Sequence, residues 1–462
     1  MPPHTTKVML LGVTITMMMV TSSFGFVASS TPRKTPPSLL HVPLKMSSSN
    51  SESSSNSGSA SGEGSTDNSF MESLRARQVE LLSREEELDS KWKSATCHSR
   101  VALSMQDWIR RMDVADYPLV ACGSSSGNIV VADLETGDVL AKTEGEDAKE
   151  HLPDLAPFLR ILYSGFDGGG TIAVAAHKDF ICSAGRQGSV QLWRLGDGQQ
   201  LVSQGSMVAA EGTLVTCLHL DDDYLWVGRM DGKLQAFSHH SATLPLALQQ
   251  KPELEWNFDS PILSMSLAQD IGYGIVTTAE GSVELFDMED DDDDLISSWI
   301  PSVDVPPSVP SHLLSSELVP TKDGGYVVAT GTTDGSLHTI PLAYKNGLLD
   351  EADPWLHDKA ASCKPKHQGS LKCLTSPLPG WLISAGQDGS MRLWDVASSE
   401  EAPNYMYQFV GYKVWIGSLW SDGKRIVSDG ADNTIVIHDF DAGEEPRKRP
   451  KKRRRNGPRR SS

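Results

Sequence analysis

Residues 382–396 read LISAGQDGSMRLWDV, the most regular hairpin pattern in this 462-residue chain. Apolar residues alternate with polar or small ones on both sides of the pair Asp388-Gly389. An Asp-Gly pair favours a tight turn with positive φ, so the pattern predicts two antiparallel strands that meet at Gly389. This pattern recurs along the chain, and the hairpin is therefore read as the unit of a repeat.

Six further hairpins follow the same plan. Their turn residues are Gly127, Gly188, Gly232, Gly281, Gly335 and Asn433. Consecutive turns are 44 to 61 residues apart, and each interval holds an alternating segment before the hairpin and another strand candidate after it. Four short strands per unit are typical of a propeller blade, and the lack of helical patterns between them argues against a parallel α/β sheet. We predict an all-β fold, a single seven-bladed β-propeller.

Two hairpins are similar to WD40 repeats: SAGQDGSMRLWDV at residues 384–396 and SAGRQGSVQLWRL at residues 183–195. The resemblance extends over about residues 97–440 and implies a hydrogen-bonded network of His, Ser or Thr, Asp and Trp in each blade. It assigns this structural network to His367, Ser384, Asp388 and Trp394, to Ser183 and Trp193, and to Ser428 and Asp432. The second unit departs from the family pattern with Gln187 at the Asp position. The seventh departs with His438 at the Trp position and Val-Gly-Tyr where Gly-His is usual.

Ring closure is predicted to involve the start of the repeat region. No alternating apolar segment follows residues 434–439, so the seventh blade lacks an outer strand, and an open strand edge favours aggregation. Residues 97–105, CHSRVALSM, alternate and are predicted to supply that strand, while residues 107–114 are predicted to form the innermost strand of the first blade.

Residues 69–96 are predicted to form an amphipathic helix before the propeller. Ser69 and Glu72 have the spacing of a capping box, and apolar residues then recur near helical spacing. Those residues are Phe70, Leu74, Leu81, Leu82, Leu88 and Trp92. The helix is expected either to pack on the propeller or to present an apolar stripe to a partner.

Residues 1–46 are interpreted as a targeting segment. The apolar stretch at 8–20 is shorter than the roughly 20 residues of a membrane-spanning helix and suits a secretory signal. The basic, Ser-rich residues that follow lack acidic residues until Glu52, and the whole segment resembles the bipartite plastid presequences of diatom-type algae. This predicts plastid localisation and no membrane span in the mature chain. Residues 47–68 are a Ser-rich linker expected to be disordered.

Residues 441–462 form a basic tail that is expected to be disordered. Its core comprises Arg447, Lys448, Arg449, Lys451, Lys452, Arg453, Arg454 and Arg455. Such a run is typical of nuclear import signals and of segments that contact nucleic acid without reading its sequence, so the alternative localisation is the nucleus. Residues 52–446, by contrast, hold 27 basic and 60 acidic residues, a net charge of −33. The folded body is therefore expected to repel phosphate backbones.

No cluster of residues predicts catalysis, a metal or a cofactor. His367, Ser384 and Asp388 are the residue types of a catalytic triad, but the family resemblance assigns them to a structural network. His239-His240 would point to opposite faces of a strand, and the acidic run 289–294 lacks the spaced ligands of a calcium loop. The six cysteines show no CxxC motif, which favours free thiols and a reducing compartment.

The predicted function is a non-enzymatic scaffold or adaptor that binds other proteins or peptides. The resemblance to WD40 proteins implies that the propeller face formed by the hairpin turns is the binding surface. Candidate contacts in those turns are Arg186, Arg229, Asp231, Glu280 and Asp334. The alternative is a nuclear RNA- or chromatin-associated factor, in ribosome assembly or a similar process, that is anchored by the basic tail.

Overall fold

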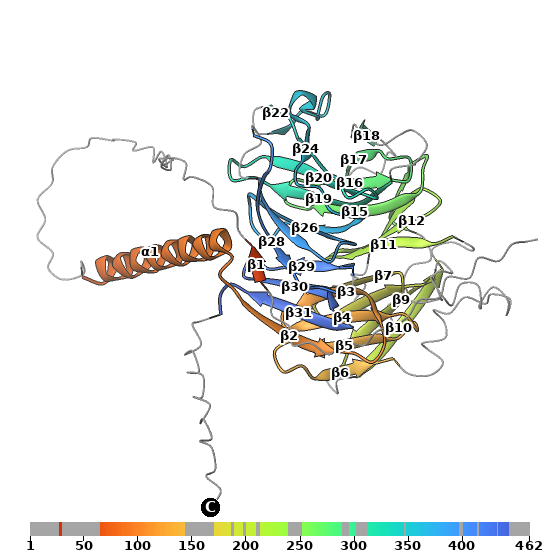
Figure 1. Cartoon of the computed structure of the whole chain (residues 1–462), viewed down its shortest axis with the longest axis horizontal. Coiled ribbons are helices and arrows are strands. Elements are labelled where there is room, and N and C mark those ends of the chain that lie inside the picture. Colours follow the sequence, from red (N-terminus) through yellow and green to blue (C-terminus); the bar gives the residue numbers. More distant parts are fainter. Residues whose placement is uncertain are drawn as a thin grey trace, which may run out of the picture.

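The protein folds as the predicted seven-bladed β-propeller (Figure 1). The structure is a computed structural model that describes residues 27–29, 65–143, 171–185, 189–196, 200–208, 213–238, 252–288, 295–301, 312–345, 348–396, 401–413, 415–431 and 433–442. Each blade is an antiparallel four-stranded sheet, and the all-β class is confirmed. The expected linker 47–68, the tail beyond residue 442, the acidic run 289–294 and His239-His240 lie wholly or largely outside the described residues, as does most of the segment 1–46.

The blades follow one another along the chain. The first three consist of β3 (Ile109–Asp116), β4 (Leu119–Ser124), β5 (Ile129–Asp133) and β6 (Val139–Lys142); β7 (Ala173–His177), β8 (Phe180–Ala184), β9 (Ser189–Leu195) and β10 (Leu201–Val208); and β11 (Val215–Leu220), β12 (Tyr224–Arg229), β13 (Lys233–Ser238) and β14 (Leu254–Asn257). The fourth and fifth consist of β15 (Ile262–Ala268), β16 (Tyr273–Thr278), β17 (Val283–Asp287) and β18 (Leu295–Trp299); and β19 (Leu313–Pro320), β20 (Tyr326–Thr332), β21 (Leu337–Pro341) and β24 (Ala361–Cys363).

The last two blades involve the N-terminal part of the chain. The sixth consists of β25 (Leu371–Thr375), β26 (Trp381–Gly386), β27 (Met391–Asp395) and β28 (Asn404–Val410), with β1 (Val27–Ser29) added at its outer edge. The seventh consists of β29 (Leu419–Ser421), β30 (Arg425–Ala431), β31 (Thr434–Asp439) and β2 (His98–Ser104). The first strand of each blade contacts the first strand of the next, and β29 contacts β3, so these seven strands surround the centre of the ring.

The hairpin turns have the backbone conformation that their residue types favour. Six of the seven turn residues have φ between 63° and 89°, and the seventh, Gly188, lies outside the described residues. At Gly335 the requirement is also steric, because a Cβ would stand 2.4 Å from the carbonyl oxygens of His367 and Gly369. Glycine is therefore needed there both for the positive φ and for the close approach of the next blade.

Strand β2 closes the ring. It pairs antiparallel with β31, from His98 opposite Asp439 to Ser104 opposite Thr434, and so provides the seventh blade with its outer strand. The chain then enters β3, the innermost strand of the first blade, where the Met112 amide donates a hydrogen bond of 3.1 Å to Ser418 Oγ of the seventh blade. The first and last blades are thus joined both at the outer edge and at the centre.

A small insertion between β21 and β24 does not follow the repeat plan. It contains β22 (Tyr344–Lys345), β23 (Leu348–Leu349) and the 3-10 helix His357–Lys359. Trp355 is buried, and its Nε1 donates a hydrogen bond of 2.9 Å to Ser297 Oγ in the outer strand of the fourth blade. The insertion therefore covers the junction between the fourth and fifth blades.

The N-terminal helix α1 (Ser65–Ser94) begins earlier than predicted. Ser69 lies inside the helix rather than at its start, so the expected capping box at Ser69 and Glu72 is wrong. Residues 65–67, which form the first turn, read Ser-Thr-Asp, and an acidic residue in the first turn is favoured by the helix dipole. Among the described residues, no helix combines the length and the apolar character required to cross a bilayer.

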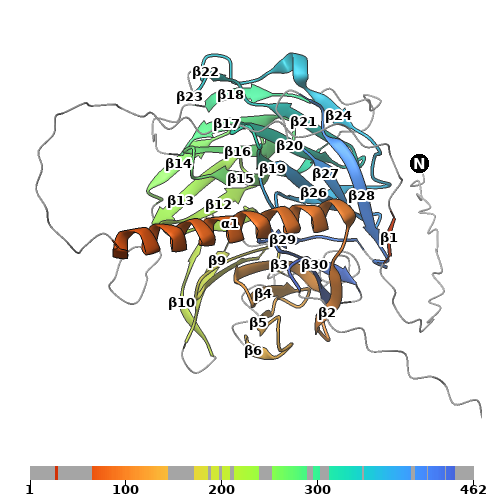
Figure 2. The same ribbon diagram turned by 90° about the vertical axis from the view of Figure 1, so that its left-hand side faces the viewer.

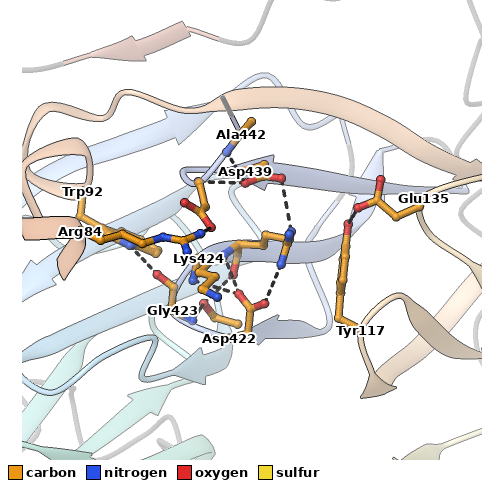
Figure 3. Close-up of polar contacts among 12 residues, drawn as sticks. Arg84, Trp92, Tyr117, Glu135, Asp422, Gly423, Lys424, Asp439 and Ala442 are labelled. Atoms are coloured by element: carbon orange, nitrogen blue, oxygen red, sulfur yellow. Dashed lines mark hydrogen bonds and ion pairs between the residues drawn. The ribbon is translucent and has the colours of Figure 1, made fainter. Parts of the chain in front are cut away.

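The last turns of α1 pack on the propeller (Figures 2 and 3). Trp92 is fully buried, its ring lies 3.9 Å from that of Phe440, and its Nε1 donates a hydrogen bond of 2.8 Å to the Gly423 carbonyl. Tyr407 donates a hydrogen bond of 2.6 Å to the Trp92 carbonyl. Arg84 forms an ion pair of 2.6 Å with Asp441, just beyond β31.

The earlier turns of α1 remain exposed. Leu74, Leu81 and Leu82 have 45%, 54% and 52% of their surface accessible. Both expected arrangements therefore occur in one helix. Its C-terminal end packs on the sixth and seventh blades, whereas its N-terminal part exposes apolar side chains.

We expect Trp92→Ala to destabilise the propeller by about 3–5 kcal/mol, because the substitution removes a buried aromatic ring and leaves a cavity against Phe440. Urea unfolding followed by tryptophan fluorescence and circular dichroism measures this difference. Leu82→Ala, at an exposed position of the same helix, is the control and should change the free energy of unfolding by less than about 0.5 kcal/mol. Equal unfolding midpoints for the two variants would contradict a bracing role for α1.

Candidate protein-interaction face

The sixth blade contains a complete hydrogen-bonded network. Trp394 Nε1 donates to Ser384 Oγ at 2.8 Å, and Ser384 Oγ lies 2.9 Å from His367 Nε2. His367 Nδ1 lies 3.0 Å from Asp388 Oδ1. The chain of contacts runs from the third strand through the second strand to the turn and connects them to the segment before β25. The four residues assigned from the family resemblance are therefore brought together.

The protonation states of His367 and Asp388 suit a network that stabilises the fold. Burial lowers the pKa of His367, so the ring is neutral and donates from Nδ1 to Asp388 while Nε2 accepts from Ser384. Burial raises the pKa of Asp388, but hydrogen bonds from His367, Gln368 and Ser390 outweigh this and hold the pKa well below its usual range. The Ser384 hydroxyl is fully buried between the indole of Trp394 and the imidazole. A substrate has no access to this oxygen.

The second and seventh blades keep parts of the network. In the second, Trp193 Nε1 donates to Ser183 Oγ at 3.2 Å, and both side chains are buried. In the seventh, Ser428 Oγ lies 2.8 Å from the Tyr412 hydroxyl rather than from a histidine. Gln187 and Asp432, the turn residues of these two blades, lie outside the described residues.

Tyr412 and Ser99 complete the network of the seventh blade, a role that no sequence pattern assigned to either residue. The Tyr412 hydroxyl lies 2.8 Å from His438 Nε2, and His438 Nδ1 lies 2.6 Å from Ser99 Oγ in β2. The two departures from the family pattern, Val-Gly-Tyr and His438, thus compensate each other. Burial lowers the pKa of His438 to about 3, so this histidine is neutral at physiological pH.

The turn face carries the residues predicted to contact a partner, but Arg229 does not fit that role. Arg229 is only 5% exposed, and its guanidinium donates to Asp231 and, at 2.9 Å, to Gln235. It fixes the turn of the third blade, where its long side chain occupies the interior. Arg186 lies outside the described residues.

The remaining candidates differ in how much surface they offer. Glu280 is exposed at the turn of the fourth blade. The Asp231 carboxylate is 34% accessible and is paired with Arg229. Asp334 accepts hydrogen bonds from Thr332 and Ser336 and forms an ion pair with Lys366. Burial raises the pKa of Asp334, but these contacts outweigh that effect and lower the pKa to about 2. Asp334 therefore stabilises its own turn.

The thiols and potential ligands show no reactive grouping among the described residues. All six cysteines are free, and burial raises the pKa of Cys217 and Cys363 to about 12, which keeps both protonated. Within the described part of the chain, no three His, Cys, Asp or Glu side chains are placed to hold a metal ion.

Parts of this chain are similar to known proteins. The structure defines a seven-bladed propeller with a His-Ser-Asp-Trp network, and the family model "WD domain, G-beta repeat" matches residues 362–395, which contain that network. The chain thus carries a WD40 repeat. It is also 28% identical over 91 residues to the ribosome biogenesis protein YTM1 of Coccidioides immitis (strain RS), a match that spans only 20% of each protein. The computationally designed Ika8 protein aligns with 74% of this chain and 99% of its own, at 15% identity and a TM-score of 0.45.

We expect His438→Gln to reduce the pH dependence of stability. An unfolded histidine has a pKa of about 6.5, whereas that of folded His438 is about 3. Between these values only the unfolded state binds the proton, so His438 contributes a loss of stability as pH falls, by up to about 1.4 kcal/mol per pH unit. The variant lacks this contribution.

Urea unfolding at pH 7, 6, 5 and 4 tests this expectation, with wild type and variant measured in parallel. The stability difference between them should shrink as the pH falls. Leu82→Ala, which changes no titratable group, is the control and should give the same pH profile as wild type. A profile for His438→Gln that runs parallel to that of wild type would contradict the buried, neutral state of His438.

Proposed function

We propose that the protein is a non-enzymatic scaffold that binds other proteins through the faces of its propeller. The observation that carries this proposal is the rigid ring of seven blades together with the WD40 repeat at 362–395. Such a ring holds many loops at fixed positions, and exposed loops on a rigid frame are suited to recognition.

The polar residues of the sixth blade support a binding rather than a catalytic role. Ser384, His367 and Asp388 are engaged with one another and with Trp394 in the interior of the blade, so their hydrogen bonds stabilise the fold. Because a fold by itself does not define a function, the proposal depends on the exposed loops and has to be tested on them.

Size-exclusion chromatography of native extract, combined with affinity capture, tests this function. The protein should elute well above its 50.1 kDa mass and retain stoichiometric partners. Glu280→Lys reverses an exposed charge on the turn face and should release a partner that binds there; Glu86→Lys, at an exposed position of α1, is the matched control. Elution of the wild-type protein as a monomer, with no partner captured, would contradict a scaffold role.

A second candidate is a nuclear RNA- or chromatin-associated factor, for example in ribosome assembly. Two observations favour it: residues 447–462 contain ten Lys and Arg residues, and part of the chain is similar to a protein named for ribosome biogenesis. In this candidate the propeller still binds proteins, while the tail provides a salt-dependent contact with nucleic acid. Plastid delivery through residues 1–46 is the competing proposal for localisation.

Fluorescent tagging in the native host distinguishes nuclear from plastid localisation. The full-length chain is compared with a chain that starts at Met46. Nuclear signal from both, and RNA binding that weakens steeply with salt and is lost on deletion of residues 447–462, is expected for the second candidate. Plastid signal that only the full-length chain gives would reject the nuclear candidate and support delivery by the N-terminal segment.

A further inference from the structure

Two tryptophans form an exposed aromatic pair at the centre of the turn face. Trp108 lies just before β3 and Trp415 lies shortly before β29, so both stand at the start of inner strands of neighbouring blades. Their rings stack at 5.4 Å with an interplanar angle of 26°, and yet 39% and 41% of their surfaces remain accessible. Large aromatic surface that is both ordered and exposed is a common feature of binding sites.

The loop that carries Trp108 is held in place. Asp107 accepts hydrogen bonds from the Trp108 amide at 2.8 Å and from Ser125 Oγ at 2.6 Å, and it also accepts from the amide and hydroxyl of Ser126. The Ser125 amide donates to the Trp108 carbonyl at 2.8 Å. Arg110 lies over the Trp108 ring, 5.4 Å from its centre. The ring is therefore presented without the entropic cost of ordering a flexible loop.

Two cations stand beside this aromatic pair. Arg111 is near the start of β3 and Lys372 is near the start of β25, and both side chains are exposed. Burial of part of Lys372 lowers its pKa, and the positive charge of Arg111 lowers it further, so the two groups lie in each other's field. Among the described residues, no carboxylate lies within ion-pair distance of either cation.

In the seventh blade, a buried carboxylate lies close to Arg111. Gly417 precedes β29, and a Cβ on it would stand 3.2 Å from Arg111 Nη1 and 3.3 Å from Asp429 Oδ2. Asp429 is buried and accepts hydrogen bonds from the amides of Gly417 and Ser418 at 2.8 and 3.0 Å. Asp429 therefore balances the charge of Arg111 only in part, and the two neighbouring exposed cations still favour a bound anion.

We propose that this surface, formed by Trp108, Trp415, Arg111 and Lys372, binds an acidic peptide segment that contains an aromatic residue. The peptide carboxylates pair with Arg111 and Lys372, and the aromatic side chain extends the stack of the two indoles. The inference rests on the proposed scaffold function and specifies the chemistry of one partner.

The charge of the molecule favours a peptide over a nucleic acid. Residues 52–446 carry a net charge of −33, so a long polyphosphate would meet repulsion on every side of this small cationic surface. A short acidic segment carries few charges and can lie within the cationic surface, so it meets less of this repulsion than a long polyphosphate does. A pocket of about 390 Å³ beside Asp107, lined in part by Met105, Val139 and Lys142, extends the contact surface for further residues of such a peptide.

Selection of phage-displayed random dodecapeptides on the full-length protein tests the proposal. Enriched peptides should combine Asp or Glu with Trp, Tyr or Phe. Fluorescein-labelled copies of them should bind wild type at physiological ionic strength, and Trp108→Ala and Arg111→Gln should each weaken binding by about tenfold. All variants keep the basic tail, so the contribution of residues 447–462 cancels in each comparison.

Matched controls exist for both substitutions. Ile300→Ala removes an apolar side chain that is 71% exposed, and Arg194→Gln removes a guanidinium that also lies over an aromatic ring, 5.5 Å from the centre of Phe180. Neither should change peptide affinity, and thermal melts should show all four variants folded.

Several results would overturn the proposal: no enriched peptide, peptides without the acidic and aromatic character, or affinities that are equal in all variants. A single-stranded oligonucleotide whose binding falls in Trp108→Ala would instead assign the surface to nucleic acid. Large complexes in native extract that persist in Trp108→Ala and Arg111→Gln, together with a failed peptide selection, would overturn this inference and leave the scaffold function intact.

Discussion

Everything in the propeller depends on one pairing between segments that are more than 300 residues apart, β2 and β31. Without β2, the seventh blade would expose an unpaired strand edge and the ring would open beside the first blade. Side chains reinforce the pairing, since Ser99 of β2 contacts His438 at 2.6 Å. Arg100 of the same strand donates a hydrogen bond of 2.8 Å to the Leu134 carbonyl of the first blade. Strand β2 thus connects the seventh blade to the first.

The blades satisfy the same physical requirement by different means. Each hairpin has to hold its turn and provide partners for most of its buried polar groups. The sixth blade uses the His-Ser-Asp-Trp network, whereas the third uses Arg229 with Asp231 and Gln235. Between blades, half-buried Asp113 accepts the Ala176 amide at 2.9 Å and keeps the adjacent inner strands in register. The degenerate repeats therefore fold alike, because different residue types form the hydrogen bonds that each turn requires.

Local features of the sequence predicted the fold and, because the seventh blade lacked an outer strand, also the distant pairing that closes the ring. The side-chain contacts between distant segments were not predictable in this way. Turn glycines and alternating apolar residues act over a few positions, and they were sufficient to predict the class, the number of blades and the hairpins. The partnership of Tyr412 with His438 depends on the registers of two blades and of β2, and no local pattern encodes it. The burial of Arg229 was missed for a related reason, because a turn residue reads as exposed until its side chain is seen to fold inward.

The two faces of the ring are suited to different tasks. Helix α1 reaches the turns between first and second strands, where Asp89 contacts both Trp381 Nε1 at 3.3 Å and Lys322 at 3.6 Å. It therefore connects the fifth, sixth and seventh blades on that face. Trp108 and Trp415 stand at the opposite ends of the inner strands, before those strands begin. Since the bracing helix leaves that face uncovered, the propeller gains stability without loss of its central aromatic and cationic surface.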